Sequence, residues 1–296
     1  MPRPLRARLR AALLVILPIS AGAAQNDFFP TDMVALPDGS SNIALYAGQQ
    51  SLSGPWANGV RTAQGELSMD LLAVRAARHY SVGENGQYTV APLLVLSGAD
   101  LGRNAALALA GPPDSGLADL RIGGAFWFHV DRENRDYALA VISVSLPTGD
   151  YSPASTLNIG ENRIKTVLAL GWMKTLDKRW VMELSPEVAF FGDNTRFAGT
   201  ERLSQDTAYA MTGTLRYKFT QGWHVYGSAQ FNRGGATQRD DVAFRGAPDN
   251  TRVAVGTLLG VGPSSQIQLR YAKDVEFSNG FRNDGEVALR WATSFR

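Results

Sequence analysis

The feature that most constrains this chain is a period-two alternation of apolar and polar side chains along most of its length. Near residue 216, for example, Leu215 and Tyr217 alternate with Arg216 and Lys218. Such alternation is typical of a β-strand with one apolar and one polar face. Runs of this kind occupy residues 41–50, 65–80, 87–97, 117–129, 136–145, 162–173, 180–191, 209–219, 223–232, 251–262, 266–273 and 285–295.

These runs predict about twelve strands, an even count, as is the rule in bacterial single-chain barrels. Most runs approach the length of about 9–11 residues that a tilted membrane-spanning strand needs. The weakest stretch is Leu71-Leu72-Ala73-Val74, which loses the alternation and could be helical. Strand length and alternation together favour a barrel that spans a membrane over a soluble sheet.

The connections between the runs alternate in length. Short connections are expected at residues 82–86, 130–135, 174–179, 220–222 and 262–265, and long ones at 98–116, 146–161, 192–205 and 233–250, with an intermediate one at 276–284. Outer-membrane barrels combine tight periplasmic turns with long extracellular loops, whereas a soluble β-sandwich has no reason to keep this parity. The sequence therefore predicts an all-β fold, a transmembrane antiparallel up-and-down β-barrel of about 12 strands with both termini in the periplasm.

The first residues have the three parts of a secretory signal peptide. Four arginines precede an apolar run at residues 11–19, and Ala21-Gly22-Ala23 offers small residues where a signal peptidase cuts. We expect a signal peptide at 1–23 with cleavage after Ala23, a periplasmic N-terminal lead-in at 24–40, and the barrel at 41–296. The pattern leaves open whether the lumen is open or is plugged by the lead-in or by a loop.

Aromatic residues gather near the predicted strand ends, as in the girdles that barrels place at both membrane interfaces. These residues are Phe126, Trp127, Phe128, Trp172, Trp180, Phe190, Phe191, Phe219, Trp223, Tyr271 and Trp291. A core cluster in a soluble β-sandwich is the alternative, which the loop parity and the signal peptide disfavour.

Composition excludes several classes of function. The chain has no cysteine, so cysteine catalysis and thiolate metal sites are absent. Its net charge of +2 gives no strong attraction to nucleic acid. A hydrophobic content of 45% is compatible with a membrane barrel, because lipid-facing and lumen-facing residues alternate in such a protein.

Few residues of the sequence are candidates for a catalytic role. The three histidines are His79 at a strand end and His129 and His224 on predicted lumen faces. His224 and Ser228 share a strand face, but residues four apart in a strand are about 13 Å apart, too far for proton transfer. No pair of histidines has zinc-ligand spacing, and Gly234-Gly235 has no following helix that would make a phosphate loop. We expect no catalytic residue, no cofactor and no metal.

Charged residues of both signs fall on the predicted inner face. Such a lumen is expected to be lined by salt bridges and polar groups rather than by catalytic carboxylates, although Asp119 and other acids are also inward. The lumen-lining candidates are Arg121, His129, Arg163, Lys165, Glu183, Glu187, Arg216, Lys218, His224, Arg270, Glu286 and Arg290.

Residues 116–172 contain the most distinctive motifs. Pro147-Thr148-Gly149-Asp150-Tyr151 is followed by Asn158-Ile159-Gly160-Glu161-Asn162, and Gly116 precedes Leu117-Ala118-Asp119-Leu120. This region resembles the outer-membrane family named for the meta-pathway of phenol degradation. The resemblance implies an outer-membrane transporter and offers no catalytic or substrate-binding residues to carry over.

We expect an outer-membrane channel that takes up small, hydrophobic or aromatic, phenol-like compounds by passive diffusion. The expected partners are outer-membrane lipids, a small-molecule solute and the barrel-insertion machinery, with no nucleic acid. A lipid-modifying enzyme remains one alternative, and it would need an activated serine or histidine at the membrane rim. A structural or adhesin barrel is another, with its activity in the long loops.

Overall fold

The computed structural model describes residues 17–18, 28–104, 106, 115–155 and 157–296. The predicted signal peptide, its cleavage after Ala23 and the start of the lead-in lie almost wholly outside this part. The short strand β1 (Leu17–Pro18) pairs in parallel with β9 (Leu157–Asn158). None of the described helices is long and apolar enough to cross a membrane.

The rest of the described chain forms a closed antiparallel barrel of twelve main strands, which confirms the predicted fold class. Each strand pairs with the next one along the chain, and β2 pairs with β20 to close the sheet. The barrel strands are β2 (Ser41–Ala57), β3 (Val60–Arg78), β5 (Tyr88–Arg103), β7 (Arg121–Asp131), β8 (Asp136–Ser145), β10 (Lys165–Thr175), β11 (Trp180–Phe191), β14 (Ala208–Lys218), β15 (Trp223–Gly234), β18 (Asn250–Val261), β19 (Ser265–Phe277) and β20 (Gly280–Phe295).

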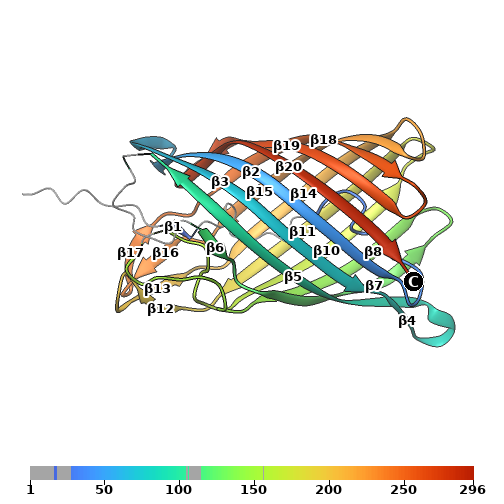
Figure 1. The fold of residues 1–296 in the computed structure, drawn as a ribbon, viewed down its shortest axis with the longest axis horizontal. Helices are drawn as coiled ribbons and strands as arrows, with labels where there is room; N and C mark the ends of the chain where they lie inside the picture. Colours follow the sequence, from blue (N-terminus) through green and yellow to red (C-terminus); the bar gives the residue numbers. More distant parts are fainter. Residues whose placement is uncertain (1–16, 19–27, 105, 107–114, 156) are drawn as a thin grey trace, which may run out of the picture.

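Short elements decorate the two ends of the barrel. At the end that carries the tight turns, which we call the turn end, β4 (Tyr80–Val82) and the 3₁₀ turn η1 (Glu84–Gly86) join β3 to β5. At the opposite end, the loop end, β6 (Ser115–Leu117) pairs with β5. A separate four-stranded sheet forms from β12 (Asn194–Phe197), β13 (Glu201–Gln205), β16 (Thr237–Arg239) and β17 (Val242–Arg245). Figure 1 shows this sheet at the opposite end of the barrel from the C-terminus.

Alternation sorts the side chains between the two faces of the barrel wall. In β10, Leu168, Leu170 and Trp172 are exposed on the outside, whereas Val167 and Ala169 are buried within. The other strands repeat this arrangement, so large apolar side chains cover much of the outer surface. A continuous apolar outer belt is the surface that a membrane barrel presents to lipid.

The stretch with the lost alternation is a regular strand, so the helical alternative is wrong. Leu71 and Ala73 face the interior, where they border a cavity, and Leu72 is exposed on the outside. Both faces of β3 are apolar here because lipid lies on one side and an apolar part of the lumen on the other. Strands with apolar surroundings on both sides have continuous apolar sequences rather than alternating ones.

Not every connection at the loop end is long. β2 and β3 run well past their predicted ends and are joined by Asn58-Gly59 alone, with φ of 49° and 78°. Positive φ at both central residues is the geometry of a tight hairpin turn, and Asn-Gly is its preferred sequence. Ser278-Asn279 similarly joins β19 to β20. The predicted parity therefore holds for the other connections and misses these two hairpins.

The segment that precedes the barrel folds back into its interior. We call residues 28–40 the N-terminal segment. Phe29, Met33 and Ala35 are at most 3% exposed, and the segment contacts several strands near the turn end. The predicted lead-in thus occupies the lumen in its described part, which answers the question of a plug that the sequence left open.

Candidate functional site

The inner wall of the barrel is divided into two chemically different arcs. The apolar arc comprises the inward-facing side chains of β3, β5, β7, β8 and β10, including Leu71, Ala91, Leu93, Val95, Ala125, Trp127, Leu139, Val141, Val167 and Met173. The polar arc comprises those of β11, β14, β15, β18, β19 and β20, including Glu183, Arg216, His224, Arg252, Gln268, Asp274, Glu286 and Arg290.

The N-terminal segment is held by both arcs. On the polar side, Gln268 donates a hydrogen bond to the Pro30 carbonyl at 3.0 Å, and Gln266 donates one to the Thr31 hydroxyl at 2.8 Å. On the apolar side, the Trp127 indole N–H donates to the Met33 carbonyl at 2.8 Å. The hydrogen bonds to the Pro30 and Met33 carbonyls satisfy backbone groups that would otherwise be left unpaired in the lumen.

The strongest anchor of the segment is Asp32, whose side chain is 2% exposed. Arg75 binds both of its carboxylate oxygens, at 2.9 and 2.5 Å, and Arg290 donates to Oδ1 at 2.6 Å. The Phe29 amide completes the shell at 3.0 Å. Arg75 comes from β3 and Arg290 from β20, so Asp32 bridges two strands that lie on either side of β2.

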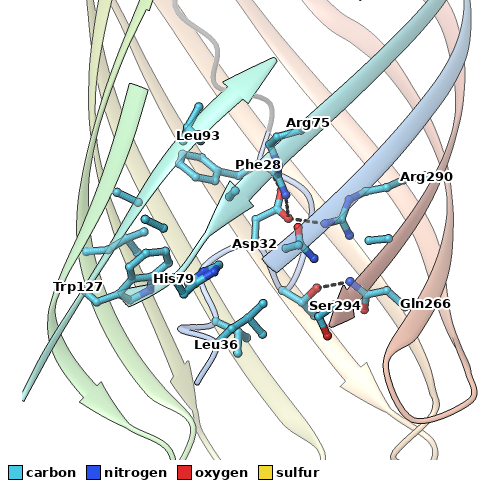
Figure 2. A pocket seen from close by; sticks show the side chains of 18 of the residues that line it. Phe28, Asp32, Leu36, Arg75, His79, Leu93, Trp127, Gln266, Arg290 and Ser294 are labelled. Atoms are coloured by element: carbon cyan, nitrogen blue, oxygen red, sulfur yellow. Dashed lines mark hydrogen bonds and ion pairs between the residues drawn. The ribbon is translucent and has the colours of Figure 1, made fainter. Parts of the chain in front are cut away.

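A cavity of about 400 Å³ lies beside the N-terminal segment, between it and the barrel wall. The segment also packs directly on the apolar arc, through Met33 and Ala35. Leu93, Trp127, Leu139 and Val141 line one part of it, and Asp32, Arg75 and Arg290 line another. Figure 2 shows Phe28 and Leu93 on one side of Asp32 and Arg290 on the other. The cavity therefore offers an apolar wall facing a charged cluster.

A second cavity of about 170 Å³ lies towards the loop end. It is bordered by Phe29, Tyr46, Leu71 and Glu286, among others. The two cavities share Arg75, Val95 and Arg121. The two cavities are therefore neighbours, and Arg75 of the charged cluster borders both.

Several predicted lumen residues come together in buried ion pairs. Arg216 donates to Glu183 at 2.8 Å and lies 3.1 Å from the ring nitrogen Nδ1 of His224. Arg270 donates to Glu286 at 2.5 Å. These groups belong to the polar arc and do not border the larger cavity, although Arg270 and Glu286 border the smaller one. Arg290, also on the polar arc, borders the larger cavity and pairs with Asp32.

A second group of predicted residues lies at the loop end. Arg163 is 2.7 Å from Glu161, Lys165 is 3.9 Å from the same carboxylate, and both cations lie over the Phe191 ring. Burial alone would raise the pKa of Glu161, but Arg163 and Lys165 outweigh it and hold that pKa below its usual value.

The remaining candidates lie near these pairs. Arg121 and Glu187 are within electrostatic reach of Lys165, and Lys218 is within reach of Arg216. Glu187 is buried on β11, and Lys218 is half-buried where β14 ends. Arg121 borders both cavities at the start of β7. Of these three residues, only Arg121 borders the cavities that make up the candidate path.

His129 is the one lumen candidate for which the alternation is wrong. A β-bulge between Trp127 and His129 inserts one extra residue, so Trp127 pairs with Leu139 but His129 pairs with Ala138. A bulge of one residue moves the following side chains to the opposite face. His129 is consequently exposed and shares the outward row of Ala138, while Trp127 stays buried inside.

Sequence reasoning missed the residues at the centre of the site. Asp32 lies in a segment without strand periodicity, so no pattern indicates where its side chain points. Arg75 could have been found, because the alternation of β3 places residues 71, 73 and 75 on one face. The apolar arc was missed because a lumen was expected to be polar throughout.

The family motifs build a scaffold at the loop end rather than a binding site. Asp119 accepts hydrogen bonds from the amides of Gly149 and Glu161, each at 2.9 Å. A Cβ at Gly149 would lie 2.7 Å from the backbone of Ala118 and Asp119, so only glycine fits. Burial raises the pKa of Asp119, against the effect of these amides.

The described residues show no arrangement typical of catalysis or metal binding. No group of three or more potential ligands is positioned to hold a metal ion among them. His79 packs on the Trp127 ring at a centroid distance of 5.2 Å, and His224 faces Arg216. Among the described residues, His79 Nδ1 and His224 Nε2 are buried without a hydrogen-bond partner.

Comparison with known proteins agrees with this architecture. The profile of the family described as "Putative MetA-pathway of phenol degradation" matches residues 54–291, which confirms the resemblance seen in the sequence. An outer membrane channel from Pseudomonas putida F1 is similar over 91% of this chain and 100% of that chain, with 24% identity and a TM-score of 0.85. No curated protein matches the chain.

Two autotransporter structures share the barrel fold more distantly. The β domain of BrkA from Bordetella is similar over 88% of this chain and 100% of that chain, with 13% identity and a TM-score of 0.51. The transport unit of AIDA-I from Escherichia coli is similar over 92% and 93%, with 8% identity and a TM-score of 0.55. These likenesses concern the fold alone.

Proposed function

The chain belongs to the phenol-degradation family of outer-membrane barrels, and from this membership we propose that it is a channel for small apolar or aromatic, phenol-like compounds. Uptake would occur by passive diffusion through the lumen, down the gradient that intracellular consumption of the compound maintains. The observation that carries the proposal is the cavity between the N-terminal segment and the apolar arc.

The chemistry of the cavity wall supports an apolar solute. Leu93, Trp127, Leu139 and Val141 offer an apolar surface without requiring the solute to form hydrogen bonds. The volume of about 400 Å³ lies within the range of small-molecule pockets and is ample for a single aromatic ring. A general porin for hydrophilic solutes would instead be expected to have a wide polar lumen.

The N-terminal segment accounts for selectivity in this proposal. It fills the turn end of the lumen, so a solute must pass beside it rather than through an open pore. The segment has no partner strand in the barrel sheet, and its part inside the lumen is joined to the wall by side-chain contacts. Its C-terminal end is tied to the wall by backbone hydrogen bonds between Gly39, Ser40 and His79. The side-chain contacts between the segment and the wall can break and re-form while the hydrogen bonds between the barrel strands stay intact.

The alternative functions have less support from the described residues. A lipid-modifying enzyme would need a nucleophile beside an activating base, and none of the three histidines has that geometry. An adhesin would act through the loop end, where the four-stranded sheet offers a surface.

Uptake into liposomes whose outer leaflet is lipopolysaccharide tests the channel, because that leaflet slows the direct entry of apolar molecules. The refolded protein should accelerate the entry of phenol and toluene over empty liposomes, and should accelerate the entry of a sugar of similar size much less. Equal acceleration of all solutes would contradict an apolar route. No acceleration by a folded barrel would contradict transport.

A further inference from the structure

The cluster around Asp32 has the geometry with which proteins recognise a carboxylate. Arg75 holds the carboxylate in a bidentate fork, and Arg290 adds a third charge-assisted hydrogen bond to it. Planar guanidinium groups match the two oxygens of a carboxylate, which is why paired arginines are common at carboxylate-binding sites. Here the bound carboxylate belongs to the chain itself.

The cluster has more positive charge than Asp32 can balance. Asp32 faces two guanidinium groups, and Nη1 of Arg290 is buried without a hydrogen-bond partner among the described residues. The cavities around it are bordered by further cations. The basic residues there are Arg75, Arg121, Arg135, Arg270 and Arg290, against Asp32 and Glu286 as the acids.

The position of Asp32 makes it exchangeable. It lies on the N-terminal segment, whereas both arginines belong to barrel strands, so the carboxylate can leave without breaking the sheet. Apolar side chains lie across the cavity from the Asp32–Arg290 contact, including Phe28 of the N-terminal segment and Leu93 of the apolar arc (Figure 2). A ring held against that wall could direct a substituent towards Arg75 and Arg290.

We propose that the preferred solutes are small aromatic or short aliphatic monocarboxylates, whose carboxylate exchanges with Asp32 on Arg75 and Arg290. This inference rests on the proposed channel function and specifies its substrate class. The exchange removes the charged anchor of the N-terminal segment and leaves its neutral hydrogen bonds at Gln266, Gln268 and Trp127. The solute therefore loosens the segment that obstructs its own path.

Benzoate and benzamide provide a matched pair of probes, because they differ mainly in charge. Single-channel current would be recorded in planar bilayers with each probe added in turn. In the wild-type protein, benzoate should alter the current at a concentration about tenfold lower than benzamide, the factor that one charge-assisted hydrogen bond supplies. Equal potency of the two probes would overturn the inference while leaving the channel function intact.

Variants distinguish recognition of a solute carboxylate by the arginines from a role in which they only anchor the N-terminal segment. Asp32→Asn empties the arginine pair of its internal carboxylate, so benzoate should act at a still lower concentration. Arg290→Gln should abolish the preference for benzoate. Arg252→Gln is the matched control, since Arg252 is also a buried lumen arginine with a carboxylate partner, Asp274 at 2.8 Å, but does not border either cavity. If Arg252→Gln loses the preference for benzoate over benzamide as fully as Arg290→Gln does, the inference is overturned.

Different results would contradict the channel function and the binding of a solute carboxylate by Arg75 and Arg290. If the folded wild-type protein shows no channel current and does not accelerate the entry of toluene into liposomes, the channel function is contradicted. Titration calorimetry of benzoate into the detergent-solubilised Asp32→Asn protein then decides the inference separately. Binding that is absent in Asp32→Asn/Arg290→Gln supports an arginine-held carboxylate, and no binding to Asp32→Asn overturns it.

Discussion

The apolar arc and the polar arc are built from the same kind of antiparallel strand, yet they contribute to the protein in different ways. The polar arc contains buried ion pairs such as Arg216–Glu183 and Arg252–Asp274. The apolar arc has no such pairs over Leu93, Ala125 and Val141, and the main cavity lies there. Both arcs therefore hold the segment, the polar arc through hydrogen bonds and an ion pair and the apolar arc through packing and the Trp127 hydrogen bond. The solute is proposed to pass where the apolar arc borders the main cavity.

Breaking an ion pair of the polar arc should have the largest effect. Glu183→Leu leaves the Arg216 guanidinium buried without its carboxylate, which should lower the free energy of unfolding by about 3–5 kcal/mol. Urea titration of the barrel refolded in phospholipid vesicles measures this loss. Because a buried pair can be replaced by apolar residues, Glu183→Leu with Arg216→Met should recover most of it. A single variant as stable as the wild type would show that the pair does not organise the polar arc.

A polar side chain on the apolar arc should have the next largest effect. Val141→Asn places an unpaired amide beside the main cavity, at a cost of about 1–3 kcal/mol for the polar group. Uptake of toluene should therefore fall about tenfold. Ser228→Asn is the matched control, because Ser228 faces inward on the polar arc and does not border the cavity. Equal losses in the two variants would remove the functional distinction between the arcs.

Loosening the contact between the N-terminal segment and the apolar arc should have a smaller effect. Trp127→Phe removes the hydrogen bond to the Met33 carbonyl and keeps most of the ring packing. The loss should be about 0.5–1.5 kcal/mol. Hydrogen exchange should show faster exchange in residues 28–40 and unchanged exchange in the barrel strands. Unchanged exchange in the segment would mean that the polar arc alone holds it.

Ion pairs outside the lumen should contribute least. Arg202 pairs with Asp193 at 3.4 Å and also contacts Asp241 at the loop end, where all three side chains are exposed. Exposed pairs of this kind contribute about 0–1 kcal/mol because water and salt screen them. Arg202→Ala should therefore leave both the unfolding free energy and the uptake of toluene nearly unchanged. A loss comparable to that of Glu183→Leu would contradict the distinction between buried and exposed pairs.

The barrel could be predicted from sequence because its determinants are local. Alternation identifies each strand, and connection length places neighbouring strands side by side, as Lys165–Thr175 and Trp180–Phe191 illustrate. The prediction of a strand is weakest at residues 71–74, because recognising a strand by alternation requires one of its faces to be polar. Where the lumen itself is apolar, both faces of the strand are apolar and the signal disappears.

The site could be predicted only in part. Glu183, Arg216 and Arg290 follow from alternation, since each occupies a regular strand. His129 was misplaced because nothing in the local sequence indicates a bulge at that point. Asp32 could not be found because its position depends on how a segment without periodicity folds back into the lumen. The contact between Asp32 and Arg290 joins residues 258 positions apart.

The central claim is that solute passes along the apolar arc beside the N-terminal segment. The natural chain has no cysteine, so Leu93→Cys introduces a single thiol on that path, and Ser228→Cys introduces one on the polar arc. Each variant would be labelled with N-phenylmaleimide, and labelling would be verified by mass before toluene uptake is measured. The account predicts that labelling at position 93 reduces uptake to the level of empty liposomes, while labelling at position 228 has little effect. A fully labelled Leu93→Cys protein that takes up toluene as fast as the unlabelled one would contradict the proposed path.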